Sequence, residues 1–374
     1  MRVLHVYKTY LPESIGGVEN VIHEIVKGTL NQGIHSEVFT LTKLNVPMEQ
    51  FYDGYKIHKC RIMFEVGSTP FSFFAIFRFR KLVRSFDLIH YHFPYPFADM
   101  LHLINGMGKP YIVTYHSDII KQKMLLKLYT PLKRYFLEGA KQVIATSPNY
   151  LKSSPVLPSI EGKVTIIPIG ITNSSYPSAS ESRRLFWSSK FPDRFFLFVG
   201  VLRYYKGLHI LLEAATRFKY PVLIVGSGPI ENELRRESVE RGVTNIHFLG
   251  HIDEEDKLAL LELCFSIVFP SHLRSEAFGV SLLEGAMYGK PLISSEIGTG
   301  TSFINIDHET GLVVPPSNPI ALANAMDTLW HDEDLAMKFG LNARKRYLEL
   351  FTGEKMSKAY VVAYRRALGL PIQN

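Results

Sequence analysis

The chain has 374 residues, of which 46% are hydrophobic, and it carries 42 basic against 35 acidic residues, a formal net charge of +7. This length predicts two domains with a hydrophobic core each, and the apolar content excludes a disordered chain. Only two cysteines, Cys60 and Cys264, are present, which excludes a disulfide framework. The short apolar stretch before Lys8 and the lack of an eighteen-residue apolar run predict a cytoplasmic protein with neither a secretory signal nor a membrane-spanning helix.

The positive charge is confined to the first half of the chain. Residues 1–174 contain 20 lysines and arginines against 12 acidic residues, whereas residues 175–374 contain 22 against 23. This asymmetry indicates that the two halves have different partners and that the first half faces an anionic one.

Strand-like and helix-like segments alternate along the first half. Short apolar or β-branched runs bounded by turn residues predict strands at 3–7, 36–41, 88–92, 111–115 and 143–145, with another ending near 167. Apolar residues at helical spacing predict helices that include 18–29, 71–84 and 125–139. The alternation is typical of βαβ units and predicts a parallel sheet covered on both faces.

A polar, turn-rich stretch at 173–180 predicts a linker, after which a second alternating series begins. Its expected strands are 195–199, 221–225, 246–248, 267–269, 292–294 and 311–314, and its expected helices are 208–216, 230–241, 254–263 and 279–288. We therefore predict an α/β fold with two doubly wound, Rossmann-like parallel-sheet domains, 1–172 and 181–354, and a C-terminal helix within 355–374 that packs back on the first domain. Two such domains place a central ligand cleft between the carboxyl ends of their sheets.

The segment with the strongest indication of a functional site contains two glutamates. Glu276 precedes a helix that is expected to begin near Gly279, and Glu284 lies within that helix. Helix-opening amides suit a phosphate oxygen, and a carboxylate can accept hydrogen bonds from two adjacent sugar hydroxyls. The alternative is that Glu276 is an acid favoured by the helix dipole and that Glu284 is solvated or ion-paired.

The turn after the first strand of the second domain carries Arg203 and Lys206, directly before Gly207. A pair of cations here is what a leaving diphosphate requires, because negative charge builds on the bridging oxygen as the glycosidic bond breaks. The alternative is a pair of basic residues on a solvated loop.

Two further motifs follow strands of the first domain. Gly16 and Gly17 open the first helix, where paired glycines allow the backbone to approach a ligand closely, although a plain tight turn also explains them. His116 ends a strand, and His90 and His92 share one face of another. Without a third ligand nearby in the sequence, we interpret that pair as cleft lining or an acceptor contact and expect no metal.

Two other patterns resemble motifs of different enzymes. Gly226 and Gly228 follow a strand, but Glu231 takes the place of the third glycine of a dinucleotide fingerprint. Asp332 and Asp334 bracket an acidic triplet of the kind found in metal-dependent transferases, but they lie between two expected helices, where an aspartate ordinarily caps the second. We predict neither a cofactor nor a metal.

Over nearly its whole length the sequence resembles the retaining glycosyltransferases of GT-B architecture, group 1, which include glycogen synthase and many bacterial polysaccharide mannosyltransferases. The hallmark is Ser-Glu-Ala-Phe-Gly at 275–279, followed by a second glutamate and by Gly-Lys-Pro at 289–291. The resemblance implies that Glu276 contacts the donor sugar and that Glu284 holds the ribose hydroxyls. It implies that the sugar and phosphate position is lined by Phe278, Gly279 and Val280.

The same resemblance assigns roles elsewhere around the donor. It places Lys206 at the diphosphate, His116 near the sugar, Gly16 and Gly17 at the phosphates and the acceptor, and Gly226 near the nucleobase. The family's usual arginine position holds Val201 here, so Arg203, two residues later, is the candidate replacement.

Two helix-period segments of the basic first domain, 71–86 and 121–134, interleave lysines and arginines with aromatic and aliphatic residues. Peripheral enzymes lie on anionic membranes through such helices; the alternative is that these helices pack on the sheet and their lysines are solvated. Given the basic charge and the lipid-diphosphate acceptors common in the resembled family, we expect the N-terminal domain to contact an anionic membrane surface. No motif indicates nucleic-acid binding.

We therefore expect a metal-independent hexosyltransferase that moves mannose from GDP-mannose to a polyprenyl-diphosphate-linked saccharide with retention. Its place would be O-antigen, lipopolysaccharide or exopolysaccharide biosynthesis at the inner face of the bacterial plasma membrane. The alternatives are a nucleotide-sugar epimerase of the same fold, a transferase that uses a UDP-sugar, and a non-catalytic basic binding protein.

Overall fold

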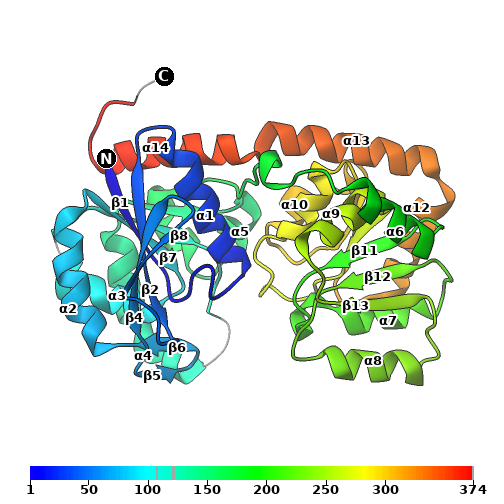
Figure 1. Cartoon of the computed structure of the whole chain (residues 1–374), viewed down its shortest axis with the longest axis horizontal. Helices are drawn as coiled ribbons and strands as arrows, with labels where there is room; N and C mark the ends of the chain where they lie inside the picture. Colours follow the sequence, from blue (N-terminus) through cyan, green and yellow to red (C-terminus); the bar gives the residue numbers. More distant parts are fainter. Residues whose placement is uncertain (107, 120–122, 373–374) are drawn as a thin grey trace. The chain divides into compact units, whose positions relative to one another are not determined.

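The computed structural model describes residues 1–106, 108–119 and 123–372, without the side chains of residues 123–125. The chain forms two compact units, shown in Figure 1: unit 1 is Met1–Gly170 with Gly353–Asn374, and unit 2 is Ile171–Thr352. Lys121, at the start of the basic segment 121–134, lies outside the described residues.

Unit 1 is built on an eight-stranded sheet in the order β10-β9-β8-β7-β1-β2-β4-β3. Neighbouring strands are parallel except at the edge, where β3 pairs antiparallel with β4. A separate hairpin joins β5 to β6. The strands are β1 (Arg2–Val6), β2 (His35–Thr42), β3 (Glu49–Tyr52), β4 (Tyr55–Arg61), β5 (Phe64–Val66), β6 (Thr69–Phe71), β7 (Leu88–Phe93), β8 (Tyr111–Tyr115), β9 (Gln142–Ala145) and β10 (Val164–Ile166).

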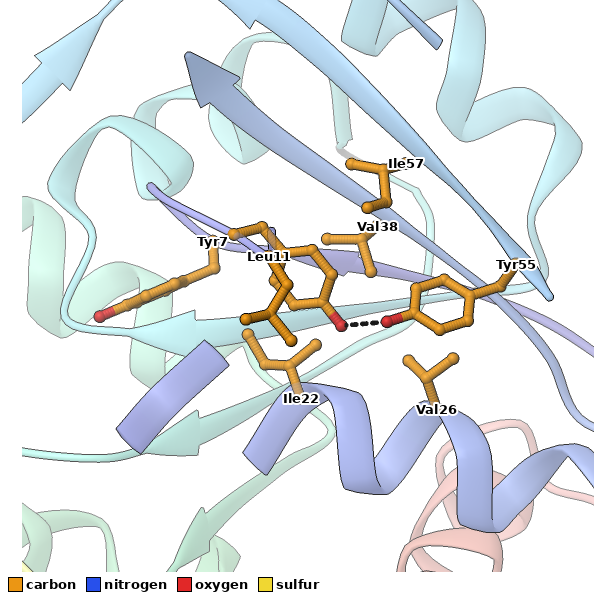
Figure 2. Packing of buried hydrophobic residues seen from close by; sticks show 8 residues of the cluster. Tyr7, Leu11, Ile22, Val26, Val38, Tyr55 and Ile57 are labelled. Atoms are coloured by element: carbon orange, nitrogen blue, oxygen red, sulfur yellow. Dashed lines mark hydrogen bonds between the residues drawn. The ribbon is translucent and has the colours of Figure 1, made fainter. Parts of the chain in front are cut away.

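The helices of unit 1 lie between its strands in the chain, except the last, which returns to it after unit 2. They are α1 (Gly17–Leu30), α2 (Phe73–Leu82), α3 (Pro96–Leu101), α4 (Lys123–Gly139), α5 (Pro148–Ser153) and α14 (Gly353–Ala367). In α1, Ile22 and Val26 lie one turn apart and point toward Ile57 of β4, as Figure 2 shows. Each such buried side chain contributes about 1.5–3 kcal/mol relative to an exposed one. This burial anchors α1 and, with it, the glycine loop that precedes the helix.

The C-terminal helix α14 is part of unit 1 and packs on α1. Gly28 of α1 permits the close approach, because a Cβ on Gly28 would lie 2.2 Å from Oγ of Ser357. Tyr360 and Tyr364 of α14 are buried, and their hydroxyls form hydrogen bonds of 2.9 Å with side chains of β8 and β7. The end of the chain thus contributes to the core of the unit that contains its beginning.

Unit 2 contains a six-stranded, wholly parallel sheet in the order β13-β12-β11-β14-β15-β16. Its strands are β11 (Phe196–Val199), β12 (Val222–Val225), β13 (Ile246–Gly250), β14 (Ser266–Phe269), β15 (Leu292–Ser295) and β16 (Gly311–Val314). Its helices are α6 (Glu181–Lys190), α7 (Leu208–Ala215), α8 (Glu231–Glu240), α9 (Glu254–Leu263), α10 (Val280–Met287), α11 (Thr301–Ile304), α12 (Pro319–His331) and α13 (Glu333–Leu350).

The predicted parallel sheets are confirmed, and most predicted elements end within two residues of the observed ones. The differences gather between residues 49 and 73, where β3, β4, β5 and β6 were not predicted and the helix expected at 71–84 begins at Phe73. Helices α3 and α5 of unit 1 and α6 and α11 of unit 2 were not predicted either. The expected cap is confirmed: the Asp332 side chain accepts a hydrogen bond of 2.9 Å from the amide of Leu335 at the start of α13.

Candidate active site

The sheet order of unit 2 brings together two motifs that are far apart in the sequence. Strand β14 lies beside β11, although the chain leaves β11 for β12 on the other side. Open α/β sheets bind ligands outside the carboxyl ends of their strands at such a switch point. Lys206 follows β11 in the short helix η5 (Tyr204–Lys206), and Glu276 lies in the loop after β14.

Lys206 and Glu276 form an ion pair in which Nζ of the lysine donates to Oε2 of the glutamate, and both side chains are nearly buried. The ammonium also lies 4.6 Å from the centre of the Phe269 ring, a cation–π contact that fixes its position. Oγ of Ser271 is 3.5 Å from the same carboxylate oxygen. The pair is a preorganised cation with a carboxylate beside it, and a phosphate oxygen is an anion that could compete with Glu276 for that cation.

The start of α10 lies in the same loop. Gly279 precedes the helix with φ at +100°, a left-handed conformation that favours glycine. The first amides of a helix have no intrahelical partner, and with the helix dipole they suit an anion. Oγ of Ser281 donates to the carbonyl of Val199 at 2.7 Å, which ties this first turn, including Val280, to the end of β11.

Two of the predicted site residues lie outside the Lys206–Glu276 pair. The Phe278 ring is buried against Phe351 and next to Gly300, which leaves its backbone as the part that could line a ligand. Arg203 is exposed, and no ion pair within the described parts of the chain includes it. The structure therefore brings Lys206, and not Arg203, to Glu276.

Gly226 serves close backbone packing between two turns. Its φ is +124°, and a Cβ there would lie 2.1 Å from the carbonyl oxygen of Gly200. The amide of Gly200 donates to Val225 at 3.0 Å, and the amide of Leu202 donates to Ser227 at 3.0 Å. The turn after β12 therefore supports the turn that carries Lys206.

Glu284 lies deeper in α10 and is held by two residues that the sequence analysis missed. Its Oε1 accepts hydrogen bonds from the Tyr176 hydroxyl at 3.0 Å and from Nζ of Lys257 at 3.1 Å. Burial disfavours the charge on Lys257, but attraction to Glu284 and to Glu254 outweighs this and raises its pKa. Within the described residues no bond engages Oε2 of Glu284, so one carboxylate oxygen is available to a ligand.

In unit 1, Gly16 and Gly17 stand at the start of α1, as predicted. A Cβ on Gly16 would lie 2.6 Å from Oε2 of Glu19, whereas a Cβ on Gly17 would meet open space. Glu19 is buried and accepts hydrogen bonds from Thr9 at 2.8 Å and from Ser14 at 2.9 Å. The carboxylate thus holds the loop from inside, and Gly16 leaves room for it.

His116 follows β8 and is almost buried, with its Nε2 2.9 Å from Nδ1 of His92. Burial lowers its pKa to about 3, so the ring is neutral at physiological pH. The interpretation of His90 and His92 as an acceptor contact is wrong, because both rings are buried and all four ring nitrogens bond to groups within unit 1. No third ligand is close to them in the sequence, but the pairing of β1 with β7 brings His5 beside them in the fold.

Comparison with known proteins decides the family. The family profile described as "Glycosyl transferases group 1" matches residues 182–346, and that of "Glycosyltransferase Family 4" matches residues 15–174. The D-rhamnosyltransferase WbpZ of Pseudomonas aeruginosa is 51% identical over 98% of this chain and 100% of that protein. The O-antigen chain mannosyltransferase C of Escherichia coli is 48% identical over 98% and 99%. The chain is a group 1 glycosyltransferase.

Solved structures agree with this assignment at the level of the fold. Sucrose-phosphate synthase from Thermosynechococcus elongatus superposes on the glycosyltransferase with a TM-score of 0.80 at 23% identity, covering 98% of this chain and 99% of that one. WaaG, a glycosyltransferase involved in lipopolysaccharide biosynthesis, superposes with a TM-score of 0.68 at 16% identity, covering 96% and 99%. The predicted GT-B fold is confirmed. Both relatives that match over the full length are named as sugar transferases. The alternative interpretations as an epimerase or as a non-catalytic binding protein are therefore rejected.

Proposed function

We propose that this glycosyltransferase moves mannose from GDP-mannose onto a polyprenyl-diphosphate-linked saccharide, with retention, in the assembly of O-antigen or a related polysaccharide. The observation that carries the proposal is the Lys206–Glu276 pair at the switch point of unit 2, beside the start of α10. The names of the mannosyltransferase and the rhamnosyltransferase that match over the full length support the choice of sugar and pathway.

In the proposed reaction, unit 2 holds the donor and unit 1 holds the acceptor. Lys206 and the first amides of α10 stabilise the diphosphate while the bond from the anomeric carbon to its oxygen breaks. Glu276 and His116 orient the sugar, and Oε2 of Glu284 accepts hydrogen bonds from the ribose. The acceptor hydroxyl bonds to the anomeric carbon on the face the diphosphate leaves and gives its proton to a diphosphate oxygen, so that atoms and charge balance without a metal.

D-rhamnose is the second candidate for the transferred sugar, because the relative with 51% identity is a D-rhamnosyltransferase. D-Rhamnose is the 6-deoxy form of mannose, so the two donors differ by one hydroxyl. A site built to bond that hydroxyl rejects the deoxy sugar strongly, whereas a site without such a bond separates the two only weakly. Direct competition between GDP-mannose and GDP-D-rhamnose therefore distinguishes the two candidates, and UDP-glucose serves as the test of the UDP-sugar alternative.

A transfer assay in excess chelator tests the proposal. With GDP-mannose and a polyprenyl-diphosphate saccharide, we expect full activity of the wild-type enzyme and a loss of roughly 10²–10³ in kcat for Lys206→Ala, the usual loss for one such donor group. Glu276→Ala should lose activity as well. The matched control is Lys219→Ala. It removes an exposed lysine that precedes β12, at the amino ends of the strands and so on the side of the sheet away from the proposed site. Full activity in either site variant, or activity that requires an added metal ion, would contradict the proposal.

We further propose that unit 1 lies on the anionic inner face of the plasma membrane, where the lipid-linked acceptor is found. Three phenylalanines of α2 are exposed: Phe73, Phe74 and Phe77 by 57%, 65% and 75%. Phe64 of the β5–β6 hairpin contacts this face through Phe73, with ring centres 6.0 Å apart. None of the described helices is long and apolar enough to cross a membrane.

An apolar hollow of about 290 Å³ continues this surface. It is lined mainly by side chains of the hairpin, α3 and α4, among them Val66, Phe71, Met100, Leu128 and Leu132. An exposed apolar surface of this kind ordinarily marks an interaction site, and the basic residues Arg80 and Lys81 of α2 and Lys127 of α4 suit an anionic lipid. We assign the hollow and the aromatic face of α2 to contact with lipid.

A further inference from the structure

Four histidines gather near the carboxyl ends of the central strands of unit 1. His5 lies on β1, His90 and His92 lie on β7, and His116 follows β8 directly; all four are buried. Strands β1 and β7 are neighbours although the chain leaves β1 for β2 on the other side, so the cluster lies at the switch point of unit 1. The elements that carry it are labelled in Figure 1.

Three of these histidines form one hydrogen-bonded row. Nδ1 of His5 lies 3.0 Å from Nε2 of His92, and Nδ1 of His92 lies 2.9 Å from Nε2 of His116. Adjacent rings in the row are nearly parallel, with centres 5.3 Å and 5.2 Å apart. The row therefore runs from the interior of the sheet at His5 to the strand end at His116.

The fourth histidine stands outside the row. Nδ1 of His90 bonds the Tyr364 hydroxyl at 2.9 Å, and its Nε2 bonds Oγ1 of Thr114 at 2.7 Å. Ring nitrogens of His5, His90 and His92 lie within 4.8 Å of one another, a spacing that metal sites also have. A metal would have to displace the hydrogen bonds that these nitrogens already make, so we assign the cluster to hydrogen bonding.

The two ends of the row differ. Nε2 of His5 is closed off from solvent and has no hydrogen-bond partner in the described structure. Nδ1 of His116 also takes no hydrogen bond from the described residues, but it is not among the closed-off atoms. Nδ1 of His116 is therefore the ring nitrogen that a substrate can reach.

Protonation of the row follows from burial. Because burial lowers the pKa of His5 and of His116 to about 3, and that of His92 in the same direction, each ring carries a single N–H. Two arrangements then satisfy both hydrogen bonds: every N–H points toward His116, or every N–H points toward His5. The first leaves an N–H on Nδ1 of His116. The second buries an N–H on Nε2 of His5 without an acceptor, and buried N–H groups without acceptors are rare.

We infer that His92, supported by His5, holds His116 in the tautomer with its proton on Nδ1, which makes His92 a positioning residue for sugar transfer. His116 then donates a hydrogen bond to an oxygen of the bound donor while carrying no charge. The link to catalysis rests on the proposed function, in which His116 faces the donor sugar. The tautomer itself does not depend on that function.

Imidazole ¹⁵N NMR combined with transfer kinetics tests the inference. The nitrogen shifts separate a protonated from a bare ring nitrogen, and we expect His116 to carry its proton on Nδ1 in the wild-type protein. His92→Phe keeps an aromatic ring in the row but removes both hydrogen bonds. In this variant we expect a mixture of His116 tautomers and a kcat about 10- to 100-fold lower, with the KM of the acceptor unchanged. His5→Phe preserves the hydrogen bond between His92 and His116. It should change the ratio of the two His116 tautomers in the same direction as His92→Phe does, but to a smaller extent.

His102→Phe is the matched control. It removes another buried histidine of unit 1, one that bonds Tyr91 at 3.1 Å outside the row, and should leave kcat and the His116 resonances unchanged. A proton on Nε2 of wild-type His116, an unchanged tautomer in His92→Phe, or equal losses of kcat in His92→Phe and His102→Phe would each overturn the inference. If His116→Ala keeps full transfer activity, the proposed role of His116 fails, while the NMR result still decides the tautomer.

Discussion

Glu284 shows how a buried carboxylate becomes usable for binding. Tyr176 and Lys257 both approach Oε1, from segments that precede the hallmark motif by many residues, and they leave Oε2 without a bond in the described structure. The lysine neutralises the charge that burial would otherwise make costly. The carboxylate is therefore oriented before a ligand arrives, which reduces the cost of ordering it on binding.

The first prediction concerns this lysine. Lys257→Met should raise the KM of the donor about 10-fold with little change in kcat, because the proposed ribose contact of Glu284 lies away from the bond that breaks. Loss of one partner of a nearly buried pair should also lower the free energy of unfolding by roughly 3 kcal/mol. Steady-state kinetics and chemical denaturation measure the two effects.

A neighbouring surface pair supplies the control for this prediction. Lys257 also pairs with the exposed Glu254 at 2.7 Å, so Glu254→Gln removes that ion pair and keeps the bond to Glu284. Exposed pairs contribute about 0–1 kcal/mol, and we expect donor KM to change less than twofold. Equal effects of the two substitutions on KM, or a loss confined to kcat, would contradict the assignment of Glu284 to donor binding.

The sequence is sufficient to single out Glu276, Glu284 and Lys206 as candidates, because each lies in a motif that resembles the family's. It does not identify Lys257 or His5. Lys257 is the single lysine of α9, a helix whose bounds were predicted correctly, but its contact with Glu284 of α10 is evident only in the structure. His5 becomes a neighbour of His90 only through the parallel pairing of β1 with β7.

At the scale of elements, α2 has an outer face that is more apolar than a solvated helix requires. Ala75 and Phe79 alone are buried, while the phenylalanines at 73, 74 and 77 face outward and Arg80 and Lys81 follow in the last turn. An exposed aromatic face with basic residues at its end is typical of helices that lie at a membrane interface. Each basic residue near an anionic surface adds about 1 kcal/mol of attraction.

The second prediction tests this face. The triple variant Phe73→Ser, Phe74→Ser, Phe77→Ser should bind vesicles that contain phosphatidylglycerol at least about 10-fold more weakly than the wild-type protein, since it removes apolar area that the bilayer would bury. Co-sedimentation measures the binding. The matched control, Met337→Ser, Leu341→Ser, Leu348→Ser, removes exposed apolar residues of α13 in unit 2 and should leave vesicle binding intact. Wild-type binding by the α2 variant would contradict the assignment.

Strand β4 illustrates what apolar patterns miss. It lies between β2 and the edge strand β3, yet it reads as polar because it carries Lys56, His58 and Lys59. Lys59 is buried. Its Nζ forms an ion pair with Oε1 of Glu13 at 2.5 Å and donates a hydrogen bond to Oε1 of Gln50. A search for apolar or alternating runs cannot find a strand whose buried lysine pairs with a carboxylate 46 residues away and donates to an amide oxygen 9 residues away.

At the scale of the whole molecule, the two units differ in their buried histidines. Unit 1 buries the four histidines of the cluster, and burial lowers the pKa of each. In unit 2 burial also lowers the pKa of His209, His247 and His272, but His209 and His247 are only partly buried. The units should therefore respond differently to acid.

The last prediction follows from the sign of these shifts. An unfolded histidine takes up a proton below pH 6.5, whereas folded His5 and His116 do so only near pH 3, so stability is complete above pH 6.5 and is lost as the pH falls toward 3. At pH 5 each costs roughly 2 kcal/mol. Asp99, whose pKa burial raises, opposes the loss but is one group against the four histidines of the cluster and His102. Hydrogen exchange at pH 7.5 and 5.0 should show unit 1 losing protection first, and His5→Phe should weaken that dependence; earlier loss in unit 2 would contradict the argument.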